Sequence, residues 1–436
     1  MPTAKKTRGG KNILPSDRIS DLPSSIIENI LMFLSTRDAA KTSILSKKWR
    51  YCWCRIPQLV LDDTLWDVSA TNQNLLRKKL VEILYQILSL HQGPIFKFVL
   101  SINDLEGCNE IDNLIVFLSR GGVKEFTLKL WLGEHYRMPS SFFSCQELRH
   151  LNLWSCLITP PPTFKGFSQL ISLRMRQVDI PPKVLGNLIS SCPLLEQLKL
   201  ELSENLNCLE IVAPKLKSFI LKSPIKCVFF KNTPVLAVVS LVLQKNEEEE
   251  NFRKVVKGMN DYFCCLPRLE NLHLDYYFIK YLCAGGIPES LTTALIHLKV
   301  LKLSYVSMDV FDEISFVFCL MRSSPNLQEM EFSFYTVGED EASDMEEFVD
   351  AQDYSDIILN MLQEVKLQYI TGTRPEMLFI KFILESSPIL EKMAIEPVAD
   401  ETYDDKFIEN AILKELTKFR RASPRAQVIY EDPVED

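Results

Sequence analysis

The sequence predicts an α/β solenoid, in which parallel strands stack on a concave face, preceded by a small helical unit and closed by a C-terminal cap. Three observations predict it. A leucine pattern recurs along most of the 436 residues, a proline precedes half of its copies at a fixed distance, and residues 17–57 carry a helical stripe instead. The composition, 47% hydrophobic and 24% charged, is that of a globular protein.

The repeating pattern is L-x-x-L-x-L, often extended by x-x-[N/C]-x-L. Its clearest copy has Leu148, Leu151 and Leu153, and continues to Cys156 and Ile158. The first apolar positions of the copies are Ile95, Val123, Leu148, Leu170, Leu195, Leu216, Leu236, Leu269, Leu298, Leu327, Leu362 and Leu390. The mean step between them is 26.8 residues, within the roughly 20–29-residue period of leucine-rich repeats. One repeat cannot bury its apolar face alone, so the copies should stack.

Proline lies two residues before the first apolar position in six copies, as at Pro193 and Pro325. Proline cannot continue a helix, and it favours an extended chain. Apolar runs with helical character lie upstream of several copies, for example at residues 184–191. Each repeat is therefore predicted to be a helix, a proline turn and a short strand. Ordinary strands of an α/β sheet are the alternative, and twelve copies at one period favour the solenoid.

The N-terminal segment, residues 17–53, follows a different pattern. Pro23 suits the first turn of a helix. One helical stripe is formed by Leu22, Ile26, Ile27, Ile30, Leu31 and Leu34. Ser35 and Asp38 resemble a capping box that opens a second helix. A unit this short is near the lower size limit for independent folding, and its stripe is more apolar than it can hide. Part of the stripe should therefore contact another protein. The alternative is a helical cap of the solenoid.

Several functional classes are disfavoured. The net charge of −8 argues against binding to nucleic acid or to anionic membranes, and no apolar run is long enough to span a membrane. No phosphate-loop, nucleophile-elbow, HExxH or repeated CxxC motif occurs, so we expect neither catalysis nor a metal or other cofactor. The sequence lacks a secretory signal, so its twelve cysteines are expected to be reduced thiols, mostly buried.

Charged segments outside the repeats are expected to be solvated. Residues 1–16 are predicted to be a disordered basic tail, which would also suit nuclear import, so the expected location is the nucleus, the cytoplasm or both. Two insertions between repeats carry runs of acidic residues, Glu247 to Glu250 and Glu339 to Glu347. These insertions are most simply loops.

Two segments resemble known domains. Residues 17–57 resemble an F-box, in which the L-P-x-x-[I/L]-[I/L]-x-x-I-L and S-K-x-W-R motifs are matched by Leu22, Pro23, Ile26, Ile27, Ile30, Leu31, Ser46, Lys47, Trp49 and Arg50. Residues 359–436 resemble an FBD domain, whose ending is matched by Phe419 to Pro424. With leucine-rich repeats over 58–358, this order is similar to that of the plant F-box/FBD/LRR-repeat family. The resemblance implies a helical F-box, a leucine-rich-repeat solenoid and an FBD cap.

The resemblance also implies a function. Such a protein would be the substrate-receptor subunit of an SCF-type ubiquitin ligase and would do no chemistry itself. Its F-box would dock on a Skp-family adaptor, which joins a cullin scaffold, while its repeats hold the target protein for ubiquitination. The adaptor contacts carried over are Leu22, Pro23, Ile26, Ile27, Ile30, Leu31 and Trp49. Some of these must instead form the core of the F-box. The alternative function is a leucine-rich-repeat interaction scaffold outside any ligase.

A target-binding patch is predicted on the concave face, where alternate strand residues point. In three neighbouring repeats these are His150, Asn152, Trp154, Ser172, Arg174, Arg176, Gln197, Lys199 and Glu201. Neighbouring strands lie about 4.8 Å apart, so the side chains should form one surface. Tryptophan and arginine are enriched at binding hot spots. The hypothesis is that Trp154, Arg174, Arg176 and Lys199 bind an acidic partner, and the alternative is a solvated sheet face.

Overall fold

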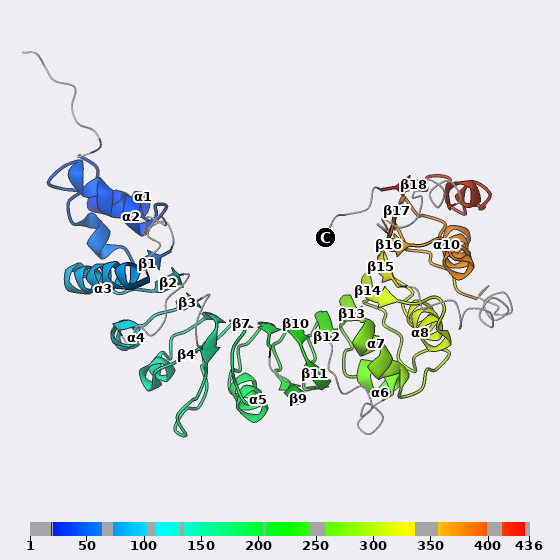
Figure 1. Cartoon of the computed structure of the whole chain (residues 1–436), viewed down its shortest axis with the longest axis horizontal. Helices are drawn as coiled ribbons and strands as arrows, with labels where there is room; N and C mark the ends of the chain where they lie inside the picture. The colour runs from blue at the N-terminus through cyan, green and yellow to red at the C-terminus, as the bar shows by residue number, and fades with distance from the viewer. Residues whose placement is uncertain are drawn as a thin grey trace, which may run out of the picture. The chain divides into compact units, whose positions relative to one another are not determined.

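The computed structural model describes residues 19, 21–62, 73–102, 110–130, 135–203, 206–243, 258–335, 356–398 and 412–431, and the predicted α/β fold is confirmed (Figure 1). The chain divides into two compact units, Met1–Glu134 and His135–Asp436, called here the first and second units. The predicted basic tail and the acidic runs of both insertions lie outside the described residues.

The first unit begins with two short helices, as predicted. Helix α1 (Ser24–Leu31) follows Pro23, and helix α2 (Thr36–Lys41) follows Ser35, whose hydroxyl accepts the Asp38 N–H at 3.1 Å. The 3-10 turns η1 (Thr42–Ile44) and η2 (Cys52–Arg55) complete this helical part. Parallel strands and longer helices then alternate: β1 (Gln58–Leu61), α3 (Gln73–Leu90), β2 (Lys97–Ile102), α4 (Glu110–Arg120) and β3 (Glu125–Leu130).

The second unit is built on one parallel sheet whose strands follow chain order. The strands are β5 (His150–Trp154), β7 (Ser172–Arg176), β8 (Gln197–Glu201), β10 (Ser218–Ser223), β12 (Val238–Leu243), β13 (Asn271–Asp275), β14 (Val300–Val306), β15 (Glu329–Phe334), β16 (Glu364–Ile370), β17 (Lys392–Pro397) and β18 (Gln427–Tyr430). Equivalent leucines lie opposite one another, as Leu151, Leu173 and Leu198 do, and all three are buried. Because side chains alternate along a strand, the repeat pattern places every leucine on the same face.

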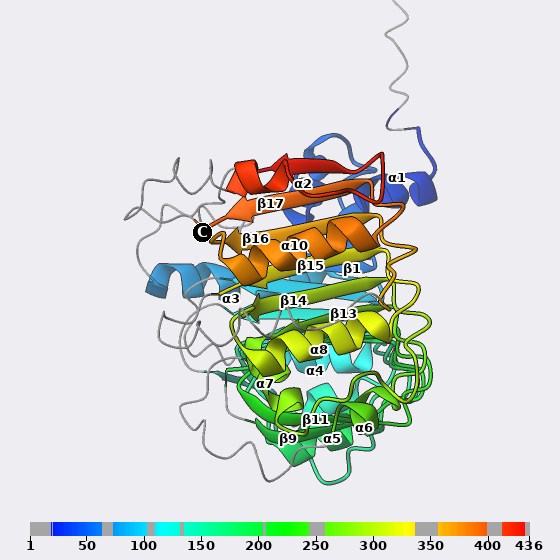
Figure 2. The same ribbon diagram turned by 90° about the vertical axis from the view of Figure 1, so that its right-hand side faces the viewer.

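Helices cover the leucine face of this sheet. The helices are α5 (Pro182–Ser190), α6 (Met259–Phe263), α7 (Tyr276–Cys283), α8 (Phe311–Arg322) and α10 (Arg374–Ser386). Figure 2 shows α7, α8 and α10 lying in front of the strands from β13 to β17. The opposite face, called here the inner face, presents the alternate strand side chains. Shorter elements complete the unit: β4 (Tyr136–Arg137), η4 (Ser140–Ser144), β6 (Cys156–Leu157), β9 (Leu206–Val212) and β11 (Ile225–Lys231).

Two predictions are wrong between β8 and β12. The expected helices are replaced there by strands β9 and β11, which form a separate parallel pair. The pairing sets Cys208 opposite Cys227 with their Cα atoms 4.7 Å apart, and the two form a disulfide. These cysteines are therefore not reduced thiols, because tertiary pairing brings together residues 19 positions apart in sequence. The remaining cysteines include six buried ones, as expected: Cys54, Cys145, Cys156, Cys192, Cys283 and Cys319.

A left-handed residue recurs at one position of the repeat. Among the described non-glycine residues with positive φ, Ser155, Gln177, Tyr305 and Tyr369 each lie two residues after the last leucine or methionine of the strand pattern. In β14 and β16 this residue is inserted as a bulge relative to β15 and β17. A bulge bends the strand and redirects a side chain. In β14 and β16, the residue at this position therefore changes the direction of the strand end and of its own side chain.

A buried carboxylate holds the loop between β16 and α10. The Glu376 side chain is 3% exposed, and it accepts the N–H groups of Thr371, Gly372 and Thr373 at 3.0, 2.8 and 3.2 Å. Burial raises the pKa of Glu376 to about 7, and the hydrogen bonds from Gly372 and Thr371 oppose that shift. The folded state thus binds the Glu376 proton more tightly than the unfolded chain does.

The contribution of Glu376 to the free energy of unfolding should therefore fall as pH rises. The folded pKa of Glu376, about 7, lies above the ordinary value of 4.5, so its contribution is fully present below pH 4.5 and is lost as pH rises through 7. We expect Glu376→Gln to reduce the loss of unfolding free energy between pH 5 and pH 8. Urea unfolding of wild type and variant at both pH values measures this difference. An unchanged pH dependence in the variant would contradict the expectation.

Candidate interaction surfaces

The helical part of the first unit has a core of its own, and the seven predicted adaptor contacts differ in how far this core buries them. The core consists of Ile27, Leu31, Ala39, Trp49 and Ile56, and Leu22 packs against it. Ile27, Leu31 and Trp49 are thus buried, Leu22 is half-buried, and Pro23, Ile26 and Ile30 are exposed. A side chain sealed in the core offers a partner little surface, so contact is open mainly to the exposed group.

Apolar side chains outside the seven predicted adaptor contacts are the most exposed in this part. Phe33 is 91% exposed and Ile44 is 88% exposed. The apolar surface, as we call it, comprises Ile26, Ile30, Met32, Phe33, Leu34, Ile44, Leu45 and Tyr51. Ile26, Ile30 and Phe33 are four and three residues apart, so they share one side of the helical turn. Exposed apolar side chains gathered in so short a segment indicate a protein interface.

The same helices also cap the first strand. The Val60 N–H donates to the Thr36 hydroxyl at 3.0 Å, and the Gln58 side-chain amide donates to the Met32 carbonyl at 2.6 Å. These two contacts agree with the alternative that the helical part caps the solenoid. It does not account for the apolar surface, because a cap uses only the side chains that it buries.

In the second unit, the register of β5, β7 and β8 brings the four predicted target-binding residues together. Trp154 lies opposite Arg176, and Arg174 lies opposite Lys199. The Arg176 guanidinium lies 4.6 Å from the centre of the Trp154 ring, a cation–π contact. The predicted patch is thus assembled on the inner face, and its binding of a partner remains a prediction.

Glu201 reduces the charge of that patch. Its carboxylate pairs with Lys199 at 2.6 Å and with Arg176 at 3.4 Å. Burial alone would raise the pKa of Glu201, but the hydrogen bond from Lys199 and the charges of Lys199 and Arg176 lower it overall. Arg174 is exposed and makes no ion pair with another described residue. The preference for an acidic partner therefore rests mainly on Arg174.

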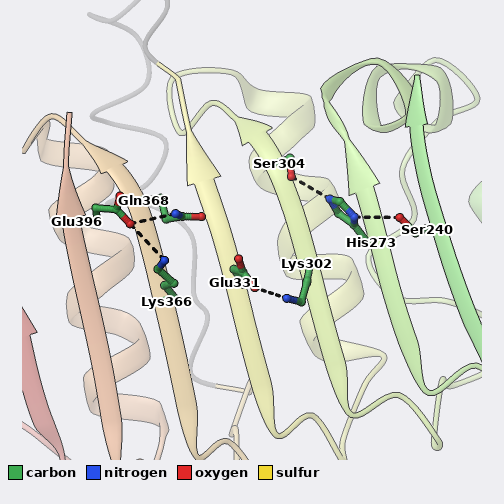
Figure 3. A network of polar contacts seen from close by, with 8 residues as sticks. All are labelled: Ser240, His273, Lys302, Ser304, Glu331, Lys366, Gln368 and Glu396. Carbon is green, nitrogen blue, oxygen red and sulfur yellow. Dashed lines mark hydrogen bonds and ion pairs between the residues drawn. The ribbon is translucent and has the colours of Figure 1, made fainter. Parts of the chain in front are cut away.

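A polar network occupies the inner face from β12 to β14 (Figure 3). His273 is bonded through Nδ1 to the Ser240 hydroxyl at 3.0 Å and through Nε2 to the Ser304 hydroxyl at 2.9 Å. Burial and, to a lesser extent, the charge of Lys302 lower the pKa of His273, so the ring is neutral at neutral pH. Neither ring nitrogen bonds a carboxylate, so the arrangement lacks the third member of a Ser–His–acid triad. The network ties three strands together.

Further along the inner face, charged side chains form pairs between neighbouring strands (Figure 3). Lys302 pairs with Glu331, Lys366 with Glu396 at 3.3 Å, and Lys392 with Glu431 at 3.5 Å. A hollow of about 270 Å³ opens among them, lined also by Glu329 and Glu364. This end of the inner face is thus rich in carboxylates.

Burial affects the reactivity of several cysteine thiols among the described residues. Burial raises the pKa of Cys145 and Cys156 to about 12 and that of Cys192 and Cys319 to about 11, which makes these thiols poor nucleophiles. Within the described ranges, no three His, Cys, Asp or Glu side chains are grouped so as to hold a metal ion.

No helix in the part of the chain that the structure describes is long and apolar enough to cross a membrane.

Three parts of the chain match known families. Residues 19–60 match the F-box domain, residues 111–332 match the LRR repeats of FBD-associated F-box protein At5g56370, and residues 357–395 match the FBD domain. These matches follow the predicted order of domains.

Individual relatives in Arabidopsis thaliana agree. The F-box/FBD/LRR-repeat protein At1g13570 is 40% identical over 424 residues, which cover 95% of this chain and 98% of the relative. The F-box/LRR-repeat protein At4g14103 is 33% identical over 42% of this chain and 49% of its own length. The FBD-associated F-box protein At4g10400 is 29% identical over 60% of this chain and 62% of its own length. Because similarity to the first of these extends over nearly the full length of both chains, this protein belongs to the plant F-box/FBD/LRR-repeat family.

Proposed function

We propose that the protein is a substrate receptor of an SCF-type ubiquitin ligase. The apolar surface docks on a Skp-family adaptor, the adaptor joins a cullin scaffold, and the inner face of the repeats holds the target. The receptor contributes proximity, because tethering raises the local concentration of target lysines near the conjugating enzyme. Family membership supports the general role, since F-box proteins with leucine-rich repeats are typically non-catalytic adaptors of ubiquitin ligases.

The apolar surface is the observation that carries this proposal. The adaptor contacts that we propose are Ile26, Ile30, Met32, Phe33, Leu34, Ile44, Leu45 and Tyr51, with Pro23 and Leu22 at the margin. Ile27, Leu31 and Trp49 act instead by holding the helices in place. A binding face needs both groups, because side chains that contact a partner must project from a rigid support. We expect the complex in the nucleus, the cytoplasm or both.

Mixing the purified full-length chain with a purified Skp-family adaptor tests the proposal. We expect a one-to-one complex on size-exclusion chromatography with light scattering at micromolar concentrations, and a larger complex when the cullin is added. A folded chain that leaves the adaptor unbound would contradict the ligase role. That result would favour the alternative, an interaction scaffold whose helical part only caps the first strand.

A further inference from the structure

Two tyrosines form a stacked pair at the ends of β14 and β16. The rings of Tyr305 and Tyr369 are parallel to within 8°, and their centres lie 6.2 Å apart. Each residue has φ of 59°, a left-handed conformation that is uncommon for bulky side chains. Each is also the inserted residue of a bulge, whereas β15 between them is regular at this level. We call Tyr305 and Tyr369 the tyrosine pair.

The tyrosine pair lies on the inner side of the sheet, where Tyr305 is exposed and Tyr369 is half-buried. The next residues, Val306 and Ile370, are buried on the leucine face, as is Phe334 of the strand between them. Tyr305 is 51% exposed, and its backbone N–H donates to the hydroxyl of Ser333 at 2.9 Å. The small serine side chain leaves room for the two rings to approach each other over β15. The fold thus places these aromatic rings outside its hydrophobic core.

At the other end of the same strands, two carboxylates lie side by side. Glu329 and Glu364 are direct register partners on β15 and β16, and both are exposed. Neither makes an ion pair with another described residue. Lys392, the register partner of Glu364 on β17, pairs with Glu431 instead. Like charges directly opposite each other destabilise a sheet. Both carboxylates line the hollow of about 270 Å³. The three lysines that also line it are each paired with another glutamate, so Glu329 and Glu364 are available to a partner.

We infer that the inner face from β14 to β16 binds a basic segment of the target protein. One Lys or Arg side chain lies between Glu329 and Glu364, and a second lies against the tyrosine pair. Aromatic faces attract Lys and Arg by cation–π interaction, and carboxylates bind the same groups by charge-assisted hydrogen bonds. Both ends of the site therefore bind the same kind of side chain, Lys or Arg. The inference rests on the proposed target-binding role of the repeats.

The strand geometry gives the spacing of the two basic side chains. Glu329 and Ser333, over which the rings approach, are four residues apart on β15, which corresponds to about 13 Å along a strand. An extended segment of the target bridges this distance with basic residues four positions apart. The segment would lie along the strands, because both ends of the site belong to the same neighbouring strands.

Peptide binding to the purified full-length chain tests this inference. The probe is a fluorescent seven-residue glycine peptide with arginine at its second and sixth positions, measured by anisotropy at low salt. We expect the probe to bind, a version with one arginine to bind less well, and a version with two glutamates not to bind. Equal affinity for the arginine and glutamate peptides would overturn the inference.

Variants locate the site. We expect Glu329→Gln with Glu364→Gln, and separately Tyr305→Ala with Tyr369→Ala, to weaken probe binding at least tenfold. Tyr305→Phe with Tyr369→Phe should keep the affinity, because it keeps the aromatic faces. The matched control, Glu210→Gln with Glu415→Gln, removes the same charge from exposed carboxylates off the strands of the inner face and should bind like wild type. An equal loss in the control would show general charge attraction and overturn the inference.

Adaptor binding separates this inference from the proposed function. All of these variants should bind the Skp-family adaptor like wild type, because their substitutions lie in the second unit. A chain that binds the arginine probe but no adaptor would support the basic-segment site and contradict the ligase role. A chain that binds adaptor but no probe would support the ligase role and overturn the site.

Discussion

Replacing Phe33 and Ile44 together by Asp is expected to abolish binding of the Skp-family adaptor without unfolding the chain. Both side chains are almost fully exposed, at 91% and 88%, so the folded chain alone loses no buried contact. Burying a large apolar side chain in an interface contributes about 1.5–3 kcal/mol, and a desolvated carboxylate without a partner adds a further cost. Two such changes should weaken binding by at least about 100-fold. Titration calorimetry with purified adaptor measures the loss.

Two further variants make this result specific. Ser25→Asp with Asn29→Asp adds the same charge to α1 at exposed polar positions and should bind nearly as well as wild type. Leu31→Asp puts a carboxylate into the core of the helical part, where Leu31 is 0% exposed, and should unfold that part. If the Phe33 and Ile44 variant is folded and still binds adaptor like wild type, the apolar surface is not the docking site.

Gly166→Ala is expected to be among the most destabilising single substitutions in the second unit. Gly166 has φ of +93°, and a Cβ atom built there would lie 2.2 Å from the Ser191 carbonyl oxygen and 2.3 Å from the Ser191 Cβ. Neither neighbour is the flexible end of a side chain, so the backbone at the end of α5 must move. We expect a loss of at least about 3 kcal/mol in unfolding free energy, measured by urea unfolding.

Gly286→Ala is the matched control for that substitution. Gly286 has a similar φ of +86°, but no atom of the described residues beyond its chain neighbours lies within 4 Å of the added Cβ. Its cost should be the conformational cost alone, about 1–2 kcal/mol. The difference between the two variants isolates the steric contact with Ser191. Equal losses in both would contradict the close packing of Gly166.

The repeated strands could be predicted because each strand pattern spans only a few neighbouring residues. The alternation of Leu151 and Leu153 with polar residues specifies which face of a strand is buried, whatever the neighbouring strand is. Ser35 likewise caps α2 through a residue three positions away. The sequence also predicted that the residues of the target-binding patch lie side by side, since Trp154 and Arg176 occupy equivalent positions in adjacent repeats.

The tyrosine pair was missed, although the sequence carries a signal for it. Tyr305 and Tyr369 each follow a strand pattern at the same distance, after Leu303 and Leu367. Aligning the repeats with one another would place both tyrosines in one column. Their contact was not predictable, because it depends on bulges in β14 and β16 but not in β15, which separates them.

By itself, the sequence determined the class of fold, the order of F-box, repeats and FBD, and the leucine face of each strand. Only the tertiary structure decided which apolar residues of the F-box are core and which are surface. Ile26 and Ile27 fit the same helical stripe, but one is 43% exposed and the other is fully buried. A stripe shows where apolar side chains gather, whereas burial depends on how much of it the neighbouring elements cover. The Cys208–Cys227 disulfide and the pairing of Glu201 with Arg176 depend in the same way on register between strands, which no local pattern specifies.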